Sequence, residues 1–156
     1  MGWFVYKKPF FFQERITQNE RKFLLYKFRS IPNLKDKPDF YGKIIRSLNL
    51  DEILQLVNIL KGDMNFIGPR PLLPEYLPHY SEKHKQRHRV KSGITGWAQV
   101  NGRNSLGWKE NFDLDIYYVN NKSRRLDFSI LYKTVLSFFK QKTNQHQIRS
   151  KFKGYE

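Results

Sequence analysis

The chain has 156 residues, no cysteine and a formal net charge of +15. Its length suits a single domain with a hydrophobic core, and without cysteine neither a disulfide nor a thiolate metal site can form. The positive charge indicates an anionic partner, such as nucleic acid, an anionic membrane surface or a phosphorylated substrate.

The first predicted element is a β-hairpin. Residues 10–15 and 23–29 are rich in aromatic side chains, and they flank a short polar segment. Within that segment Asn19 is the residue best suited to a left-handed turn. Two prolines and several charges then predict a loop over residues 31–41.

The next segment predicts a helix that carries two adjacent carboxylates in its first turn, Asp51 and Glu52. Asn49 suits the N-cap position, and Glu52 three residues later completes a capping box. Gly62 is expected to end the helix. Its apolar face is formed at helical spacing by Ile53, Leu56, Val57 and Leu60.

The second half of the chain continues with mostly helical patterns. Residues 68–71 contain two prolines and cannot be helical. The remaining expectations are a loop over residues 73–78, a polar helix over 81–88, a glycine-punctuated loop or strand over 92–104, and helices over 109–121 and 126–139. His84 and His88 are expected on a solvated helix face rather than in a metal site.

These patterns predict an α+β fold, mostly helical, with a small β-hairpin or sheet. No change in composition divides the chain, so residues 1–156 are interpreted as one domain. Residues 141–156 are polar and basic, which favours a flexible basic tail. No apolar run approaches the roughly 18 residues that a membrane-spanning helix needs.

Asp51 and Glu52 admit two interpretations. Acidic residues in a first helical turn complement the helix dipole, which is a purely structural role. Alternatively, a helix N-terminus keeps Asp51 ionised, as a nucleophile or metal ligand must be, and the pair then suits phosphate chemistry. A carboxylate that attacks a phosphoryl group needs nearby positive charge, from a divalent metal or from cations such as Lys27, Arg29, Arg46 and Arg70.

Two further features point the same way. Arg70 stands between two prolines, and a stiff loop loses less entropy when its side chain binds a phosphate. Residues 93–104 combine three glycines with Gln99, Asn101 and Arg103. Such a run either forms an irregular loop or brings polar groups close to a ligand.

The chain as a whole resembles the bacterial sugar transferases, which are monotopic polyprenol-phosphate phosphoglycosyl transferases. The matching segments occur in order along the chain and span roughly residues 9 to 140. They are PFFFQER (9–15), YKFRS (26–30), LDE (50–52) with Gln55 and Leu56, LKGDM (60–64), GPRPLL (68–73), RH (87–88), GITGWAQVNGRN (93–104), Asp115 and YYV (117–119).

This resemblance implies an enzyme that moves a sugar-1-phosphate from a UDP-sugar to a polyprenyl phosphate such as undecaprenyl phosphate, with release of UMP. It implies that Asp51 forms a covalent phosphosugar intermediate and that Asp51 and Glu52 hold Mg²⁺. The implied phosphate-binding residues are Lys27, Arg29, Arg46 and Arg70, and the implied nucleotide-sugar residues are Gln99, Asn101 and Arg103.

The resemblance also implies a location at the cytoplasmic face of the bacterial inner membrane. Members of the family begin with a re-entrant hydrophobic helix, and residues 1–8 are interpreted as the truncated end of that anchor. We therefore expect peripheral binding to an anionic membrane surface and no nucleic-acid partner. Two alternatives stay open: a basic nucleic-acid-binding module, and an inactive truncated remnant of the transferase.

Overall fold

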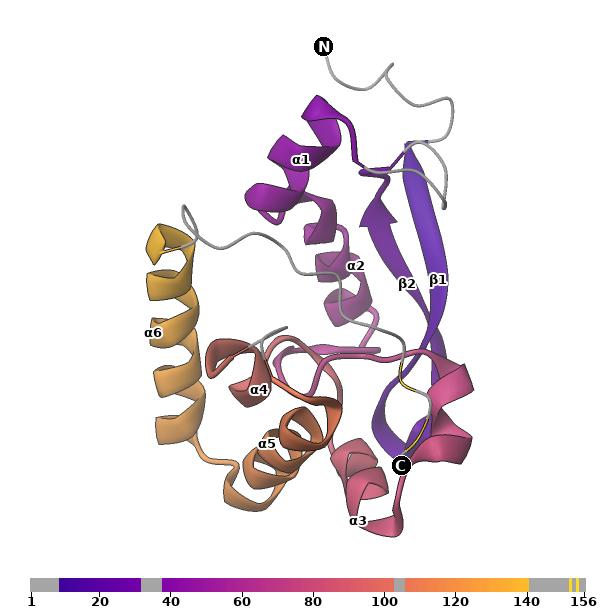
Figure 1. The fold of residues 1–156 in the computed structure, drawn as a ribbon, viewed down its shortest axis with the longest axis vertical. Helices are drawn as coiled ribbons and strands as arrows, with labels where there is room; N and C mark the ends of the chain where they lie inside the picture. The colour runs from indigo at the N-terminus through magenta and orange to yellow at the C-terminus, as the bar shows by residue number, and fades with distance from the viewer. Residues whose placement is uncertain (1–8, 32–37, 103–105, 141–151, 153, 155–156) are drawn as a thin grey trace.

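A computed structural model of the chain describes residues 9–31, 38–102, 106–140, 152 and 154 (Figure 1). Strands β1 (Phe10–Ile16) and β2 (Lys22–Phe28) form an antiparallel hairpin. The turn η2 (Gln18–Glu20) joins them, and Asn19 has a φ of 54° within it. The predicted hairpin and its left-handed asparagine are therefore confirmed.

The rest of the described chain is mostly helical, which confirms the predicted fold class. In Figure 1 the hairpin runs along one side of the molecule and α6 lies on the opposite side. The remaining elements are α1 (Phe40–Ser47), η3 (Leu50–Glu52), α2 (Gln55–Leu60), β3 (Asn65–Ile67), η4 (Pro74–His79), α3 (Glu82–Lys85), η5 (Gln86–Arg89), β4 (Gly93–Thr95), α4 (Trp97–Val100), α5 (Trp108–Asn121) and α6 (Arg124–Lys140).

The glycine-rich segment packs tightly against another part of the backbone. Strands β3 and β4 pair in parallel, with Ile67 opposite Thr95. A Cβ atom on Gly93 would lie 2.1 Å from the backbone nitrogen of Gly68, and one on Gly96 would lie 2.2 Å from the Gly68 carbonyl oxygen. The glycines are needed because the loop that begins at Gly68 crosses directly over them.

The larger core is aromatic. Tyr76, Tyr80, Phe112 and Phe152 are buried together, and Trp108 packs against them. Phe152 belongs to the segment predicted to be a flexible tail, yet its exposure is 4%. Apart from Gly154, the other tail residues lie outside the described part of the chain, as do residues 1–8.

The prediction that Asn49 caps a helix is wrong. Asn49 is left-handed, with a φ of 52°, and its side chain makes no capping hydrogen bond. Helix α1 instead begins where a loop was predicted, and its N-cap is Asp39, whose carboxylate accepts a bond from the Gly42 amide at 2.7 Å. The helix predicted after Asn49 is instead divided into the turn η3 and helix α2, and Leu54 at the N-cap of α2 makes no side-chain cap.

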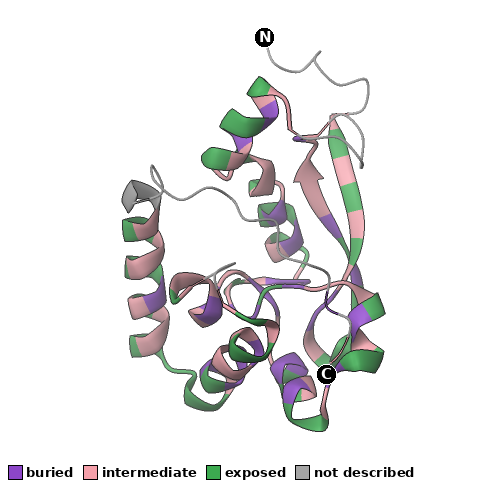
Figure 2. Cartoon of the chain, in the orientation of Figure 1, coloured by how far each residue is buried: buried purple, intermediate pink, exposed green. Residues whose placement is uncertain are grey.

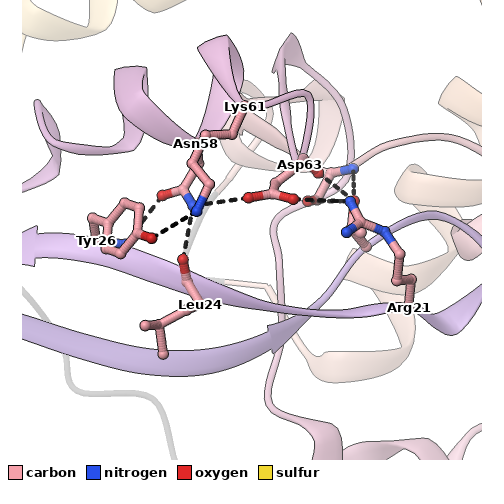
Figure 3. Close-up of polar contacts among 8 residues, drawn as sticks. Arg21, Leu24, Tyr26, Asn58, Lys61 and Asp63 are labelled. Atoms are coloured by element: carbon pink, nitrogen blue, oxygen red, sulfur yellow. Dashed lines mark hydrogen bonds and ion pairs between the residues drawn. The ribbon is translucent and has the colours of Figure 1, made fainter.

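Helix α2 buries polar residues rather than its apolar ones. Asn58 is fully buried, whereas 88% of Leu60 is exposed. Figure 2 shows both buried and exposed stretches along α2. Asn58 Oδ1 accepts from the Tyr26 amide at 3.1 Å, and its Nδ2 donates to the Leu24 carbonyl at 2.7 Å (Figure 3). The free edge of β2 presents unpaired backbone groups, and the Asn58 amide satisfies them.

The expectation of a solvated face around His84 and His88 is also wrong. Their exposures are 4% and 6%, because α3 and η5 pack against α5 and the hairpin turn. Among the residues that the structure describes, no group of three or more potential metal ligands is found, and no helix is long and apolar enough to span a membrane.

Candidate active site

A cavity of about 710 Å³ lies where η3, α4, α5 and the loop after β3 meet. Both predicted carboxylates, Asp51 and Glu52, line it. Most of its other charged groups are cations, so the cavity suits an anionic ligand. The charged lining residues are Arg15, Lys27, Arg46, Asp51, Glu52, Arg70, Arg87 and Asp115.

Glu52 is held by two cations from different parts of the fold. Its Oε1 accepts from Lys27 Nζ at 2.7 Å and from Arg70 Nη2 at 3.0 Å. Burial alone would raise the pKa of Glu52, but the charges of Arg70 and Lys27 outweigh burial, and the pKa falls well below its ordinary value. Glu52 is therefore a carboxylate at neutral pH.

Asp51 behaves in the opposite way. Burial raises the pKa of Asp51 above its ordinary value, with Lys27 and Arg46 opposing and the adjacent Glu52 adding to the rise. Asp51 lies in a 3-10 turn rather than at the start of an α-helix, and burial is the largest influence on it. Two neighbouring carboxylates thus have pKa values shifted apart, and the more basic one, Asp51, is the better nucleophile.

The two carboxylates fit a magnesium ion that is shared with a phosphorylated ligand. Mg²⁺ commonly takes one or two carboxylates from the protein and completes its octahedron with phosphate oxygens and water. Both cation contacts of Glu52 are made to Oε1. The donor set therefore suits an ion held jointly by Asp51, Glu52 and a ligand phosphate.

One side of the cavity is apolar and open to solvent. Five of its lining residues are large apolar side chains that are each more than a third exposed, on or near α1, η3, α2 and β3. A cation-rich interior beside an apolar rim suits a ligand with a phosphate head and a hydrocarbon part. The rim residues are Leu48, Leu50, Ile53, Leu56 and Phe66.

The other predicted site residues divide into two groups. Lys27, Arg46, Arg70 and Gln99 line the cavity. Arg29 and Asn101 are not among the lining residues, and Arg103 lies outside the described part of the chain. The side chain of Asn101 instead donates to the Trp97 carbonyl at 2.8 Å and accepts from Lys133 at 3.0 Å. The Arg29 guanidinium lies 5.9 Å from the centre of the Phe11 ring.

Three charged lining residues were given no role by the sequence: Arg15, Arg87 and Asp115. Burial and the charge of Arg70 lower the pKa of Arg15 to about 10, and Arg15 Nη1 donates to the Pro71 carbonyl at 3.3 Å. All three residues occur in segments that resemble the sugar transferases. Their position in these segments was the signal in the sequence that could have identified them, because their spacing follows no recognisable pattern.

Comparison with known proteins adds to this geometry. A family model described as bacterial sugar transferase matches residues 3–141. An uncharacterized sugar transferase, EpsL of Bacillus subtilis (strain 168), is 49% identical over 136 residues, which cover 81% of this chain and 67% of EpsL.

Two longer relatives have names that state an activity. The UDP-N-acetylgalactosamine-undecaprenyl-phosphate N-acetylgalactosaminephosphotransferase of Aeromonas hydrophila is 34% identical, over 80% of this chain and 34% of its own length. The UDP-glucose:undecaprenyl-phosphate glucose-1-phosphate transferase of Xanthomonas campestris pv. campestris is 36% identical, over 86% of this chain and 32% of its own length. The chain thus spans about a third of each of these two relatives.

Proposed function

The chain belongs to the bacterial sugar transferase family, and we propose that it is a phosphoglycosyl transferase that moves a sugar-1-phosphate from a UDP-sugar to undecaprenyl phosphate and releases UMP. The names of the Aeromonas and Xanthomonas relatives state such a transfer for those proteins. The observation that carries the proposal is the Asp51–Glu52 pair, whose pKa values diverge inside a cavity rich in cations.

In the first half of the reaction, a carboxylate oxygen of Asp51 attacks the phosphorus atom that carries the sugar. The bond from that phosphorus to the bridging oxygen breaks, and its electron pair leaves with UMP. An acyl phosphate then joins the sugar to Asp51. The higher basicity of Asp51 favours this attack, and Arg46, which also lines the cavity, reduces the repulsion between the two anions.

In the second half, a phosphate oxygen of undecaprenyl phosphate attacks the same phosphorus. The bond to Asp51 breaks, and the carboxylate is regenerated. The apolar rim of Leu48, Leu50, Ile53, Leu56 and Phe66 supports a lipid acceptor, because it places hydrocarbon surface beside the charged interior. The same rim and the net charge of +15 support peripheral association with an anionic membrane, and the family resemblance favours the cytoplasmic face of the inner membrane as its location.

Asp51 and Glu52 are the residues that would hold Mg²⁺ in this scheme. When bound, Mg²⁺ neutralises charge on the donor diphosphate. Glu52 also stays anionic because of Lys27 and Arg70, so it remains available as an oxygen ligand. Gln99 lines the cavity with its amide fixed by a bond from Nε2 to the Ile94 carbonyl at 2.8 Å, and we assign it to the donor sugar or nucleotide.

The test is to incubate the full chain with UDP-sugars that are labelled in the sugar-linked phosphate, without and then with undecaprenyl phosphate in detergent. We expect label on the protein first, at Asp51, with one UMP released, and then transfer of the label to lipid. Asp51→Asn should abolish labelling and UMP release while thermal unfolding stays unchanged, since an amide cannot attack phosphorus.

The matched control is Asp113→Asn, at a half-buried aspartate that pairs with Lys83 and His84 outside the cavity. This variant should label and turn over like the wild type. Turnover by Asp51→Asn near the wild-type rate would remove Asp51 from the mechanism. An unlabelled wild-type protein that releases no UMP from any donor would refute the proposed function.

A further inference from the structure

The loop that presents Arg70 is held almost entirely through its carbonyl oxygens. Pro69 and Pro71 flank Arg70 and have no N–H group to donate. The Gly93 amide donates to the Pro69 carbonyl at 3.0 Å, and Arg15 Nη1 donates to the Pro71 carbonyl at 3.3 Å. The position of Arg70 therefore depends on donors that come from other parts of the chain.

The carbonyl of Arg70 itself is held by a buried arginine. Arg87 Nη2 donates to it at 2.8 Å. Arg87 Nε and Nη2 also donate to Oδ2 of Asp115, at 3.1 and 2.7 Å, and Nη1 donates to the Tyr80 hydroxyl at 3.3 Å. Every nitrogen of the guanidinium is thus engaged inside the protein, so Arg87 is not a phosphate-binding group although it lines the cavity.

The surroundings of Arg87 fix it rigidly. Its side chain and that of Asp115 are only 2% and 6% exposed. Burial would lower the pKa of Arg87, but Asp115 and Tyr80, through charge and hydrogen bonds, together outweigh it and raise the pKa of Arg87 above its ordinary value. The guanidinium also lies 5.8 Å and 5.4 Å from the ring centres of Tyr80 and Phe112, which belong to the aromatic core.

We propose that the buried Arg87–Asp115 pair is a positioning device for Arg70. The pair connects the aromatic core to the Arg70 carbonyl, and the Arg70 guanidinium in turn reaches Glu52 Oε1 at 3.0 Å. Half of the Arg70 side chain is exposed, so packing around the side chain does not fix it, and the anchored backbone does. A buried ion pair that adds little net stability is well suited to such a geometric role.

The discriminating variant is Arg87→Lys. Lysine keeps a positive charge beside Asp115, but a single ammonium group cannot hold Asp115 and the Arg70 carbonyl in one planar fork. Turnover depends on the proposed transferase function, and a misplaced binding group costs up to about 10²-fold. We expect a loss of about 10- to 100-fold in kcat for Arg87→Lys, with most of the protein still folded.

A double-mutant cycle separates positioning from mere stability. If Arg87 acts through Arg70, then Arg87→Lys should cost nothing further in an Arg70→Gln background, because the group that it positions is already missing. Independent losses that multiply would overturn the proposal. Arg89→Lys, an exposed arginine in the same turn, is the matched control and should keep wild-type turnover.

A second readout needs no turnover, so it distinguishes a failed inference from a failed function. Hydrogen exchange of the Arg70 Nε–H group can be followed by NMR in the full chain, and it should be faster in Arg87→Lys because Arg70 is no longer held against Glu52. If Arg87→Lys does not fold, Tyr80→Phe removes one contact of Arg87 and should accelerate the same exchange by a smaller amount. Unchanged Arg70 exchange in the folded variant would refute the positioning role.

Discussion

Lys27 and Glu52 are 25 residues apart in the sequence, and Lys27 Nζ donates to Glu52 Oε1 at 2.7 Å. Lys27 belongs to strand β2, and Glu52 belongs to the turn η3. Both side chains are only 16% exposed, so the pair is largely withdrawn from solvent. Removing Lys27 would leave Arg70 as the remaining cation bonded to the largely buried Glu52 carboxylate, so the Glu52 charge would be less well compensated.

Lys27→Gln should therefore raise the pKa of Glu52 and lower turnover by about 10²-fold, a typical cost for losing one electrostatic partner in an active site. Because Glu52 acts as a carboxylate, its raised pKa should move the loss of activity on the acidic side to higher pH. The measurement is the pH dependence of UMP release.

Lys22→Gln is the control, since Lys22 lies on the same strand and pairs with Glu14 at 3.3 Å outside the cavity. Equal profiles for the two variants would contradict this prediction.

Removing divalent metal should stop UMP release. Without the metal, the donor diphosphate would keep part of its negative charge, because the lining arginines and Lys27 neutralise only some of it. We expect activity to be lost in a chelator and restored by excess Mg²⁺, with thermal unfolding unaffected by either. Undiminished turnover in chelator would mean that the cations of the cavity suffice alone.

The apolar surface of α1 and α2 should carry the part of membrane binding that resists salt. Phe40 and Leu60 are 81% and 88% exposed, and burying a large apolar side chain is worth about 1.5–3 kcal/mol and is not screened by salt. At low salt the positive charge should hold nearly all of the protein on anionic vesicles, so the double variant Phe40→Ser/Leu60→Ser should sediment like the wild type. At high salt its affinity for the vesicles should be about 10²-fold or more below that of the wild type. Phe128→Ser on α6, where 71% of Phe128 is exposed, is the comparison. A larger loss in Phe128→Ser would place the contact on α6 instead.

His88 should make the protein less stable in mild acid. Burial, helped by the charge of Arg87, lowers the pKa of His88 from 6.5 to about 3. Between these values the unfolded chain binds a proton that the folded chain does not, so the free energy of unfolding falls as the pH drops through this window. His88→Gln should flatten this slope between about pH 6 and pH 4.5, as measured by urea unfolding. His79→Gln, at an exposed histidine, is the control, and an equally steep slope in His88→Gln would refute the assignment.

Local patterns were sufficient for several elements of this fold. The aromatic strands and their polar turn predicted the hairpin, and helical spacing predicted α5 and α6. These elements follow from the sequence because their hydrogen bonds are local, between residues i and i−4 in a helix or across a short turn in a hairpin. The adjacent carboxylates and the proline-flanked arginine were likewise visible as a motif, since their chemistry resides in neighbouring residues.

Tertiary structure alone decided which side chains meet. Asn58 is buried because the free edge of β2, whose Tyr26 amide is 32 residues away, needs hydrogen-bond partners. Arg87 bonds to Asp115 and Arg70, which are 28 and 17 residues away in the sequence. No helical or strand periodicity indicates such contacts. Likewise, the pKa values of Asp51 and Glu52 diverge because one carboxylate is buried with less compensation while the other faces two cations. Burial and charge at a site are sums over the whole fold. The sequence therefore indicates candidate reacting groups, and the tertiary structure decides their protonation and the contacts that hold them.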